Sequence, residues 1–415
     1  MQKINLHLDT SKAIDPNSLR FNDSLLAPVP TFTKAQLKAF KCVLCNVVQY
    51  EGNPILFNLR NQRNVPKQFN PQQIGHKPLV AVLTKLRNNG LLKLEKGTPW
   101  YTKGEDGDFK DRKLSSFIPN EQLMLLAESA GITKESIEET IRSHVVLRDD
   151  KENILEYEPT PYTQHIEQLM GAYCDYLKKQ RVTLDDEPIE GFFLTRKYQD
   201  CGRDASFRYG GRSFHPFMGL TKERRARIKI NGQTTVSVDY AASVPNLLYQ
   251  AITGQRLHPY DPYQVTGLPR VIAKKYANIM LNTASTKSAS GAIGKWLKDK
   301  RTKKRDQEAH AKAIARFRGR PAIMDAILER NEPIKNCFFQ GKAMGQHYAW
   351  LEANLVFEVA RYAVHWDIPA LTVHDEFIVP EENEDGMNEL LYTVGLDETI
   401  YDSDCLMKSI RQLSQ

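Results

Sequence analysis

The sequence predicts an α+β protein, because long segments with helical spacing of apolar residues alternate with a few short strand-like runs. The strand-like runs fall at residues 91–102, after Gly191, and in two apolar stretches that each present an aspartate. No internal repeat and no long linker rich in serine, glycine or proline is visible in the 415 residues. At about 100–200 residues per domain, we expect three parts, at 1–105, 106–190 and 191–415.

Composition excludes several classes of protein. Hydrophobic residues make up 41% and charged residues 26% of the chain, which is ordinary for a globular protein and excludes wholesale disorder. No run approaches the ~20 apolar residues of a membrane span, and the N-terminus lacks the apolar segment of a secretory signal. Of the six cysteines only Cys42 and Cys45 are close in sequence, and helical spacing predicts both in a core rather than in a four-ligand zinc site. We therefore expect a cytoplasmic protein with reduced thiols.

The net charge of +7 is concentrated in two blocks. Residues 295–320 hold eleven Lys and Arg against three acids, and residues 200–229 hold eight against three. Such blocks favour polyanionic partners, of which the phosphate backbone of a nucleic acid is the commonest; a solvated helical face or a disordered loop is the alternative. We expect a cationic channel along a nucleic acid, and its candidate contacts in the first block are Lys300, Arg301, Lys303, Lys304 and Arg305.

Residues 31–103 predict two helices and a β-hairpin. The first helix, capped by Thr31 or Thr33, runs to about Val48, and the second ends before Gly90. Two short strands are expected around a turn at 95–97. This order resembles a winged helix, whose last helix commonly enters a DNA groove; a winged helix that contacts only proteins is the alternative. The following part predicts a helical connector or thumb-like region, with helices at 120–132, 134–146 and 162–180.

Two short apolar strands each present an aspartate. In the first, Val236 and Val238 alternate with polar residues and lead into Asp239. In the second, residues 374–376 form an acidic tight turn between two apolar runs, which predicts a β-hairpin with Asp375 at its tip. Either aspartate alone is commonly a cap or turn residue. Carboxylates on neighbouring strands, however, can hold two Mg²⁺ ions about 3.5–4 Å apart for phosphoryl transfer.

The stretch between the aspartates contains a helix that presents cations on one face. It begins at Pro269, since proline is favoured in the first helical turn. Arg270, Lys274 and Asn278 follow at spacings of four residues, with Asn282 one step further. Each step turns the helix face by only about 40°, so the first three side chains share one face. Arginine and lysine on one face suit the binding of a triphosphate; an amphipathic surface helix is the alternative.

In their order along the chain these segments resemble the motifs of the family A DNA polymerases and of their relatives, the single-subunit phage-type RNA polymerases. VSVDYAASVPNLLY is similar to motif A, the helix from Arg270 has the spacing of motif B, and LTVHDEFIVP is similar to motif C. Residues 345–368 have the place and length of the family's palm helix. RYGGRSF at 208–214 is similar to an element that precedes motif A in the phage-type RNA polymerases. The resemblance covers residues 208–380.

The resemblance implies a right-hand polymerase core, with an antiparallel palm sheet and helical fingers and thumb. It implies two Mg²⁺ ions, with Mn²⁺ as a substitute, and the expected metal ligands are Asp239, Asp375 and the backbone carbonyl of Tyr240. Lys274 becomes a catalytic residue that neutralises the departing pyrophosphate. The residues expected to bind the incoming nucleotide are Arg270, Lys274, Asn278, Asn282, Tyr240 and Val244. Those expected at the primer or template are Arg212, His374 and Glu376.

Departures from the family concern the sugar and the base of the substrate. The DNA polymerases carry a glutamate five residues after the motif A aspartate that crowds the 2′ position, and this sequence has Val244 there. Asn282 and Thr283 replace a Tyr-Gly pair in motif B, whereas Glu376 ends motif C as in the DNA polymerases. Val244 therefore favours ribonucleotides as substrates, whereas Glu376 favours deoxyribonucleotides. It also leaves no segment for a proofreading domain.

We expect a small DNA polymerase without proofreading, which transfers nucleotides from dNTPs to a primer 3′-OH on a template. A primase or single-subunit RNA polymerase that uses rNTPs is the first alternative, favoured by Val244 and the GGRSF element. A non-catalytic DNA-binding regulator with a degenerate polymerase fold, and a phosphotransferase acting on small molecules, are further alternatives. Small size and missing proofreading suggest a plasmid, phage or other mobile element of a bacterial cell.

Overall fold

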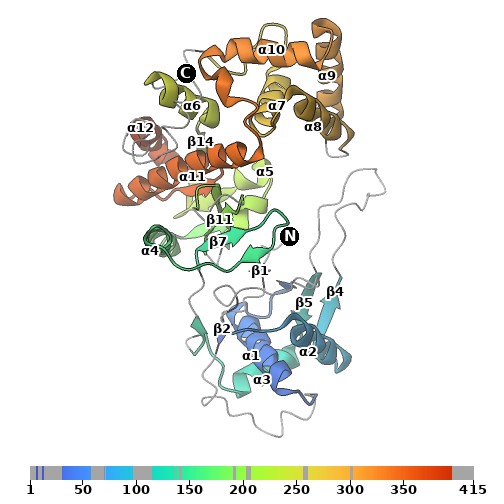
Figure 1. Ribbon diagram of the computed structural model, residues 1–415. Coiled ribbons are helices and arrows are strands. Elements are labelled where there is room, and N and C mark those ends of the chain that lie inside the picture. Colours follow the sequence, from blue (N-terminus) through green and yellow to red (C-terminus); the bar gives the residue numbers. More distant parts are fainter. Residues whose placement is uncertain are drawn as a thin grey trace. The chain divides into compact units, whose positions relative to one another are not determined.

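Both helices and sheets form in the computed structural model, which confirms the predicted α+β class (Figure 1). The residues that the structure describes are 6–7, 12–13, 30–57, 70, 72–96, 115–134, 136–139, 143–189, 193–201, 207–255, 260–299 and 302–394. The chain divides into two compact units, residues 1–143 and 144–415. The expected middle part at 106–190 is shared between these units.

Helices supply most of the core of the first unit, and they are α1 (Lys34–Gln49), α2 (His76–Asn88) and α3 (Glu121–Ser129). α1 begins where predicted, because Thr33 and Gln36 form a reciprocal capping box that satisfies backbone amides of the first turn. Cys42 and Cys45 are both fully buried in α1. This burial confirms the prediction that the two thiols are core residues.

The sheet of the first unit contains the first strand of the predicted hairpin, β4 (Leu92–Glu95). Its antiparallel partner is β5 (Ser115–Pro119), in which the fully buried Phe117 lies opposite Leu94 and anchors the register. The second strand expected directly after residue 97 lies outside the described residues. With β1 (Leu6–His7) and β3 (Ile55–Phe57), the strand order is β1-β3-β5-β4.

The helix predicted at 134–146 is wrong, because strands form there. Glu138–Glu139 is β6, and Val145–Arg148 is β7. β7 pairs in parallel with β11 (Thr195–Gln199), and its two buried valines have branched side chains that favour strands. Long-range pairing therefore overrides the local helical pattern. The helices predicted at 120–132 and 162–180 are confirmed as α3 and α4 (Pro161–Lys178).

A four-stranded sheet in the second unit contains the GGRSF segment as β12 (Gly210–Phe214). β12 pairs antiparallel with β11, and the strand order is β12-β11-β7-β8, with β8 at Ile154–Leu155. Gly210 and Gly211 have φ values of 77° and 78°, and a Cβ atom on Gly211 would lie 2.9 Å from the Tyr198 ring. Only glycine suits this backbone and this close approach, which together fix the position of the following residue, Arg212.

The two predicted aspartate strands lie side by side in a six-stranded sheet. β14 (Gln233–Asp239) pairs antiparallel with β16 (Glu376–Pro380), and β16 forms the predicted hairpin with β15 (Leu371–Val373). Asp239 lies opposite Glu376 in this register, so both aspartates are at the same end of neighbouring strands. The strand order is β10-β9-β13-β14-β16-β15, with β9 at Val182–Leu184, β10 at Glu187–Pro188 and β13 at Ile228–Ile230.

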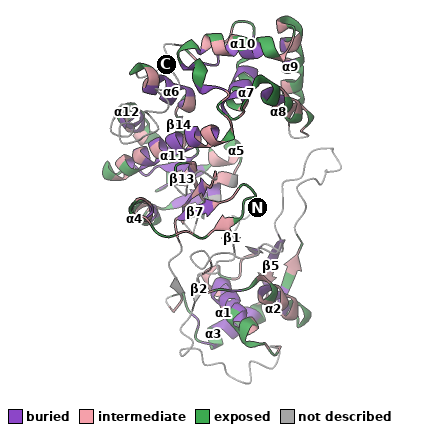
Figure 2. Ribbon diagram, in the orientation of Figure 1, coloured by how far each residue is buried: buried purple, intermediate pink, exposed green. Residues whose placement is uncertain are grey.

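Helices complete the second unit. One group is formed by α7 (Arg270–Leu281), α8 (Thr286–Lys298), α9 (Lys304–Phe317) and α10 (Arg320–Arg330) (Figure 1). α8 and α9 are largely exposed, whereas α11 (Lys342–His365) buries much of its length (Figure 2). α11 packs against β12 and against α6 (Ser243–Thr253) and α12 (Glu384–Val394). Among the described helices, none combines the length and apolar character that crossing a membrane requires.

Candidate active site

The tip of the β14–β16 pair brings the two predicted aspartates together. Asp239 ends β14, and Asp375 is in the two-residue turn that joins β15 to β16. The Tyr240 amide donates a hydrogen bond of 3.2 Å to the Asp375 carbonyl oxygen, which holds the end of one strand against the turn of the other. His374, the other turn residue, has a φ of 58°, a left-handed conformation that is uncommon outside glycine. The backbone thus places two carboxylates on neighbouring strand ends.

The two carboxylates differ in their environment. Asp239 is exposed, whereas Asp375 is half-buried. Burial raises the pKa of Asp375 above its ordinary value, and the nearby carboxylate of Glu352 acts in the same direction, while Lys274 opposes them. A cation bound beside Asp375 would offset this repulsion, so the charge environment of the tip favours a metal ion.

Helix α7 presents the predicted cationic face. Arg270, Lys274, Asn278 and Asn282 are exposed, while the opposite face of the helix is buried. α7 ends where the Asn282 side-chain amide donates a hydrogen bond of 2.8 Å to the Asn278 carbonyl oxygen. A Cβ atom on Gly345 of α11 would overlap the Asn282 side-chain oxygen, so this glycine allows α11 to approach the end of α7.

A cavity of about 560 Å³ is lined by residues of the strand tip, α7, α11 and the sheet that contains β12. This volume is in the range of small-molecule binding sites. The predicted site residues that line it are Arg212, Val244, Lys274, Asn278, Asn282, His374 and Asp375. The described lining does not include Asp239, Tyr240, Arg270 or Glu376. The cavity therefore joins one aspartate of the tip to the face of α7.

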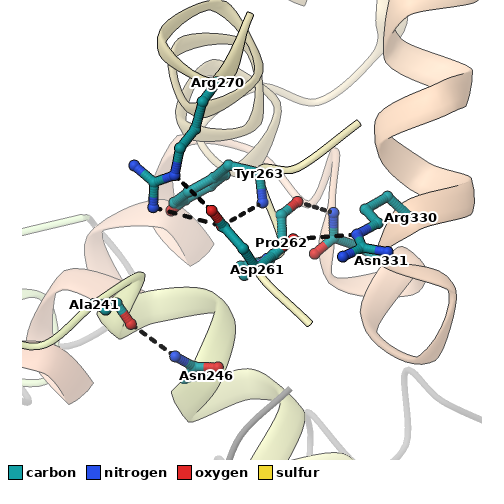
Figure 3. A network of polar contacts seen from close by, with 8 residues as sticks. All are labelled: Ala241, Asn246, Asp261, Pro262, Tyr263, Arg270, Arg330 and Asn331. Atoms are coloured by element: carbon teal, nitrogen blue, oxygen red, sulfur yellow. Dashed lines mark hydrogen bonds and ion pairs between the residues drawn. The ribbon is translucent and has the colours of Figure 1, made fainter. Parts of the chain in front are cut away.

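Arg270 is engaged by an aspartate that sequence reasoning missed. Its Nε donates to Asp261 Oδ2 over 2.5 Å, and its guanidinium lies 5.4 Å from the centre of the Tyr263 ring (Figure 3). The end of α10 anchors this segment, because Arg330 donates to the Asp261 carbonyl oxygen at 3.1 Å and Asn331 donates to the next carbonyl oxygen at 2.9 Å. Arg270 is still 54% exposed, so a phosphate that binds it competes with Asp261.

Glu352 of α11 is a second residue that sequence reasoning missed. It lines the cavity and is only 5% exposed. Its Oε1 accepts a hydrogen bond of 2.5 Å from Ser243 Oγ, and its Oε2 accepts from the guanidinium of Arg212. The available signal was an acidic residue on the apolar face of the expected palm helix, at helical spacing from Tyr348 and Leu355.

Two further basic residues line the cavity, Lys197 of β11 and Arg148 of β7. Burial lowers the pKa of Lys197 to about 8, and the nearby charge of Arg148 acts in the same direction. The Lys197 Nζ lies 3.7 Å from the centre of the Phe214 ring. Cations thus face the cavity from β7 and β11 as well as from α7.

Glu376 and Tyr240 have structural partners around the tip. Glu376 forms an ion pair of 2.8 Å with Arg225 of α5 (Lys222–Arg225), in which both side chains are 15% exposed, and it also accepts a hydrogen bond from Ser237. The Tyr240 hydroxyl donates to the Leu391 carbonyl oxygen of α12. Through these contacts Glu376 links the strand tip to α5, and Tyr240 links it to α12.

The main basic block is described only in part. Lys300 and Arg301 lie outside the described residues. Lys303, Lys304 and Arg305 are exposed at the start of α9, and none of these three lines the cavity. Their contact with a nucleic acid stays a prediction.

The residues at the tip fit a magnesium ion that is shared with a phosphate. Within the described part of the chain, no group of three or more His, Cys, Asp and Glu side chains is arranged to hold a metal. Mg²⁺ needs no such cage, because it is commonly bound by one or two carboxylates together with substrate phosphates and water. Asp239 and Asp375 offer those carboxylates, and the raised pKa of Asp375 marks an environment that a cation would stabilise.

Any functional conclusion for this chain rests on the geometry of the site. No family model matches the chain, and no match is found among curated proteins or solved structures.

Proposed function

We propose that the second unit is a metal-dependent nucleotidyltransferase that extends the 3′ end of a nucleic acid on a template. The observation that carries the proposal is one cavity lined by both Asp375, at a strand tip shared with Asp239, and the exposed cationic face of α7. Transfer from a nucleoside triphosphate needs carboxylates for a metal at the reacting phosphate and basic groups at the outer phosphates.

The residues in and around the cavity each have a role in this reaction. Asp239 and Asp375 would hold Mg²⁺, which lowers the pKa of an attacking hydroxyl and shields phosphate oxygens when bound. Lys274 binds the outer phosphates and stabilises the charge on the departing pyrophosphate. Arg270 joins Lys274 by exchanging Asp261 for a phosphate oxygen. The sheet side of the cavity, where Arg212 and His374 lie, receives the primer or template.

Two sugars are candidates for the substrate. The resemblance to family A DNA polymerases favours a dNTP that is added to a primer. Val244 favours the alternative, an RNA polymerase or primase that uses rNTPs, because a short apolar side chain lines the cavity where the DNA polymerases have a glutamate.

The proposal includes a winged helix in the first unit, which would bind DNA. Three observations support it: α2 leads into β4, β4 pairs antiparallel with β5, and β5 pairs antiparallel with β3, which follows α1. Lys34 and Lys38 are exposed one turn apart on α1, which contains no acidic residue, and they suit contact with a phosphate backbone.

The test is nucleotide incorporation by the full-length protein with Mg²⁺, comparing dNTPs with rNTPs, with and without a primer, on one template. Product whose sequence follows the template supports the proposal. Absence of product under every combination contradicts it, and duplex binding without product would favour a non-catalytic regulator. Phosphate transfer between small molecules without nucleic acid would favour a phosphotransferase.

A further inference from the structure

Glu352 has an electrostatic position that nucleotidyl transfer alone does not explain. It is a buried carboxylate on α11, and it lines the cavity together with Val244 and Asp375. Burying a charged group is unfavourable unless ion pairs and hydrogen bonds compensate for the lost water. The donors that surround Glu352 therefore indicate what else it binds.

The hydrogen bonds of Glu352 leave one acceptor position open. An ionised carboxylate offers about four acceptor positions, two on each oxygen. Oε2 accepts from both Nε and Nη2 of Arg212, which uses its two positions. Oε1 accepts from Ser243 Oγ, which uses one. Among the described residues, no further hydrogen-bond donor to Oε1 is present.

The open position lies near the place of the substrate's sugar. Ser243, which binds the same oxygen, directly precedes Val244, and both line the cavity. Glu352, Tyr263 and Asp375 line this same cavity. With a triphosphate between the strand tip and α7, the sugar is the next group after the reacting phosphate. Its hydroxyls are the donors that the substrate brings to this wall of the cavity.

We propose that Glu352 accepts a hydrogen bond from the 2′-hydroxyl of a ribose and thereby makes ribonucleotides the preferred substrate class. This inference rests on the proposed nucleotidyl transfer and decides between its two candidate sugars. A 2′-deoxy sugar would leave the acceptor unpaired in a largely buried site, which disfavours that substrate. The hydroxyl belongs either to the incoming nucleotide or to the primer terminus, since both present the same chemistry.

The variant that tests the inference is Glu352→Gln. The glutamine amide has one oxygen, and the Arg212 guanidinium requires it as an acceptor, so the NH₂ group replaces the carboxylate oxygen beside Ser243. We expect the wild-type protein to prefer ribose by about tenfold or more in kcat/KM, and Glu352→Gln to lose this preference. rNTPs and dNTPs are each compared on primers with ribose and deoxyribose ends, which identifies the sugar that is read. The matched control Glu358→Gln, on the same helix but paired with Arg361 at 2.8 Å, keeps the preference.

Each outcome bears on the inference. A purely structural role for Glu352 would lower kcat/KM for both sugars by the same factor; an unchanged ratio overturns the inference and leaves the proposed function standing. A wild-type preference for deoxyribose, both in the incoming nucleotide and at the primer end, also overturns the inference and leaves the proposed function standing. If no nucleotide is incorporated at all, the proposed function fails, and the affinities of ATP and dATP with Mg²⁺, measured by calorimetry, decide the inference. Tighter ATP binding that Glu352→Gln abolishes supports it, and equal affinities overturn it.

Discussion

The strand tip and the face of α7 supply opposite charges to one cavity, but they are built differently. At the tip, Asp375 is half-buried and its neighbour Glu376 is paired with Arg225, so the carboxylates are held by the sheet and its surroundings. On α7, Lys274 and Asn278 are exposed, and Lys274 forms no ion pair with any described residue. The carboxylates at the strand tip are thus in place before substrate binds, whereas the side chains on α7 are still solvated.

This difference indicates that the strand tip and α7 have separate roles in the reaction. Groups that are fixed in advance stabilise a transition state without reorganising during the reaction, which suits the carboxylates at the tip. Exposed cations attract a triphosphate and release a product readily, because their charge is not committed to a protein partner. Arg270 is intermediate, since Asp261 holds it until a phosphate competes.

The largest effect is expected from neutralising the tip. Asp239→Asn and Asp375→Asn should each lower nucleotide incorporation by at least about a thousandfold, because several kcal/mol of metal-assisted stabilisation are lost. The matched control is Asp367→Asn, which removes an exposed carboxylate that accepts a hydrogen bond from Tyr176 and does not line the cavity. If both tip variants retained wild-type rates, the carboxylates would not be the metal ligands.

The next effect concerns how the tip is held. Arg225→Met should lower the free energy of unfolding by about 2 kcal/mol, because Glu376 is then left without its partner in a site that is largely removed from water. Adding Glu376→Gln to that variant should recover part of the loss. Urea unfolding measures both changes. Stability unaffected by Arg225→Met would mean that the pair does not hold the tip.

A smaller effect is expected on α7. Lys274→Ala should raise KM for the nucleotide about tenfold and also lower kcat, with little change in stability, since a charge-assisted hydrogen bond to the bound triphosphate and to the departing pyrophosphate is lost from an exposed side chain. Lys287→Ala on α8, an exposed lysine that does not line the cavity, is the control. Equal KM values for the two variants would show that α7 does not bind the nucleotide.

The raised pKa of Asp375 should also affect the thermal stability of the protein. The pKa of Asp375 is raised in the folded protein, so the ionised carboxylate destabilises the fold as pH rises through that pKa. At neutral pH without Mg²⁺, Asp375→Asn should therefore melt at a higher temperature than the wild-type protein, and mildly acidic pH should reduce the difference. Mg²⁺ with a nucleotide should stabilise the wild-type protein more than the variant. A lower Tm for the variant at neutral pH would contradict the sign of the pKa shift.

The smallest effect is expected from releasing Arg270. Asp261→Asn weakens a partly exposed ion pair, so nucleotide KM should fall by only about twofold to threefold. Steady-state kinetics at low ionic strength would reveal this change. A rise in KM would show that Asp261 positions Arg270 for the substrate instead of competing with it.

Local patterns in the sequence predicted the parts of the site that depend on local structure. The 3.6-residue period placed Lys274 and Asn278 on one exposed helix face, and two apolar runs around an acidic turn predicted the hairpin with Asp375. Chain order and family resemblance then suggested that Asp239 and Asp375 meet, which the strand register confirms.

The features that the sequence did not reveal depend on contacts between distant segments. Glu352 meets Arg212 and Ser243 only after α11 packs on β12 and α6. The helix expected at 134–146 instead contributes β7, because pairing with β11 is a long-range interaction that local spacing does not encode. Burial and pairing of this kind decide which charges face the cavity.

The most direct test is a crystal structure of the protein with a primer–template, Mg²⁺ and a nucleoside triphosphate analogue whose reacting bond cannot be cleaved. We expect Mg²⁺ at about 2.0–2.1 Å from carboxylate oxygens of Asp239 and Asp375. We also expect the outer phosphates to contact Lys274 and Arg270 of α7. A nucleotide bound outside this cavity, or a metal that contacts neither aspartate, would contradict the proposed function.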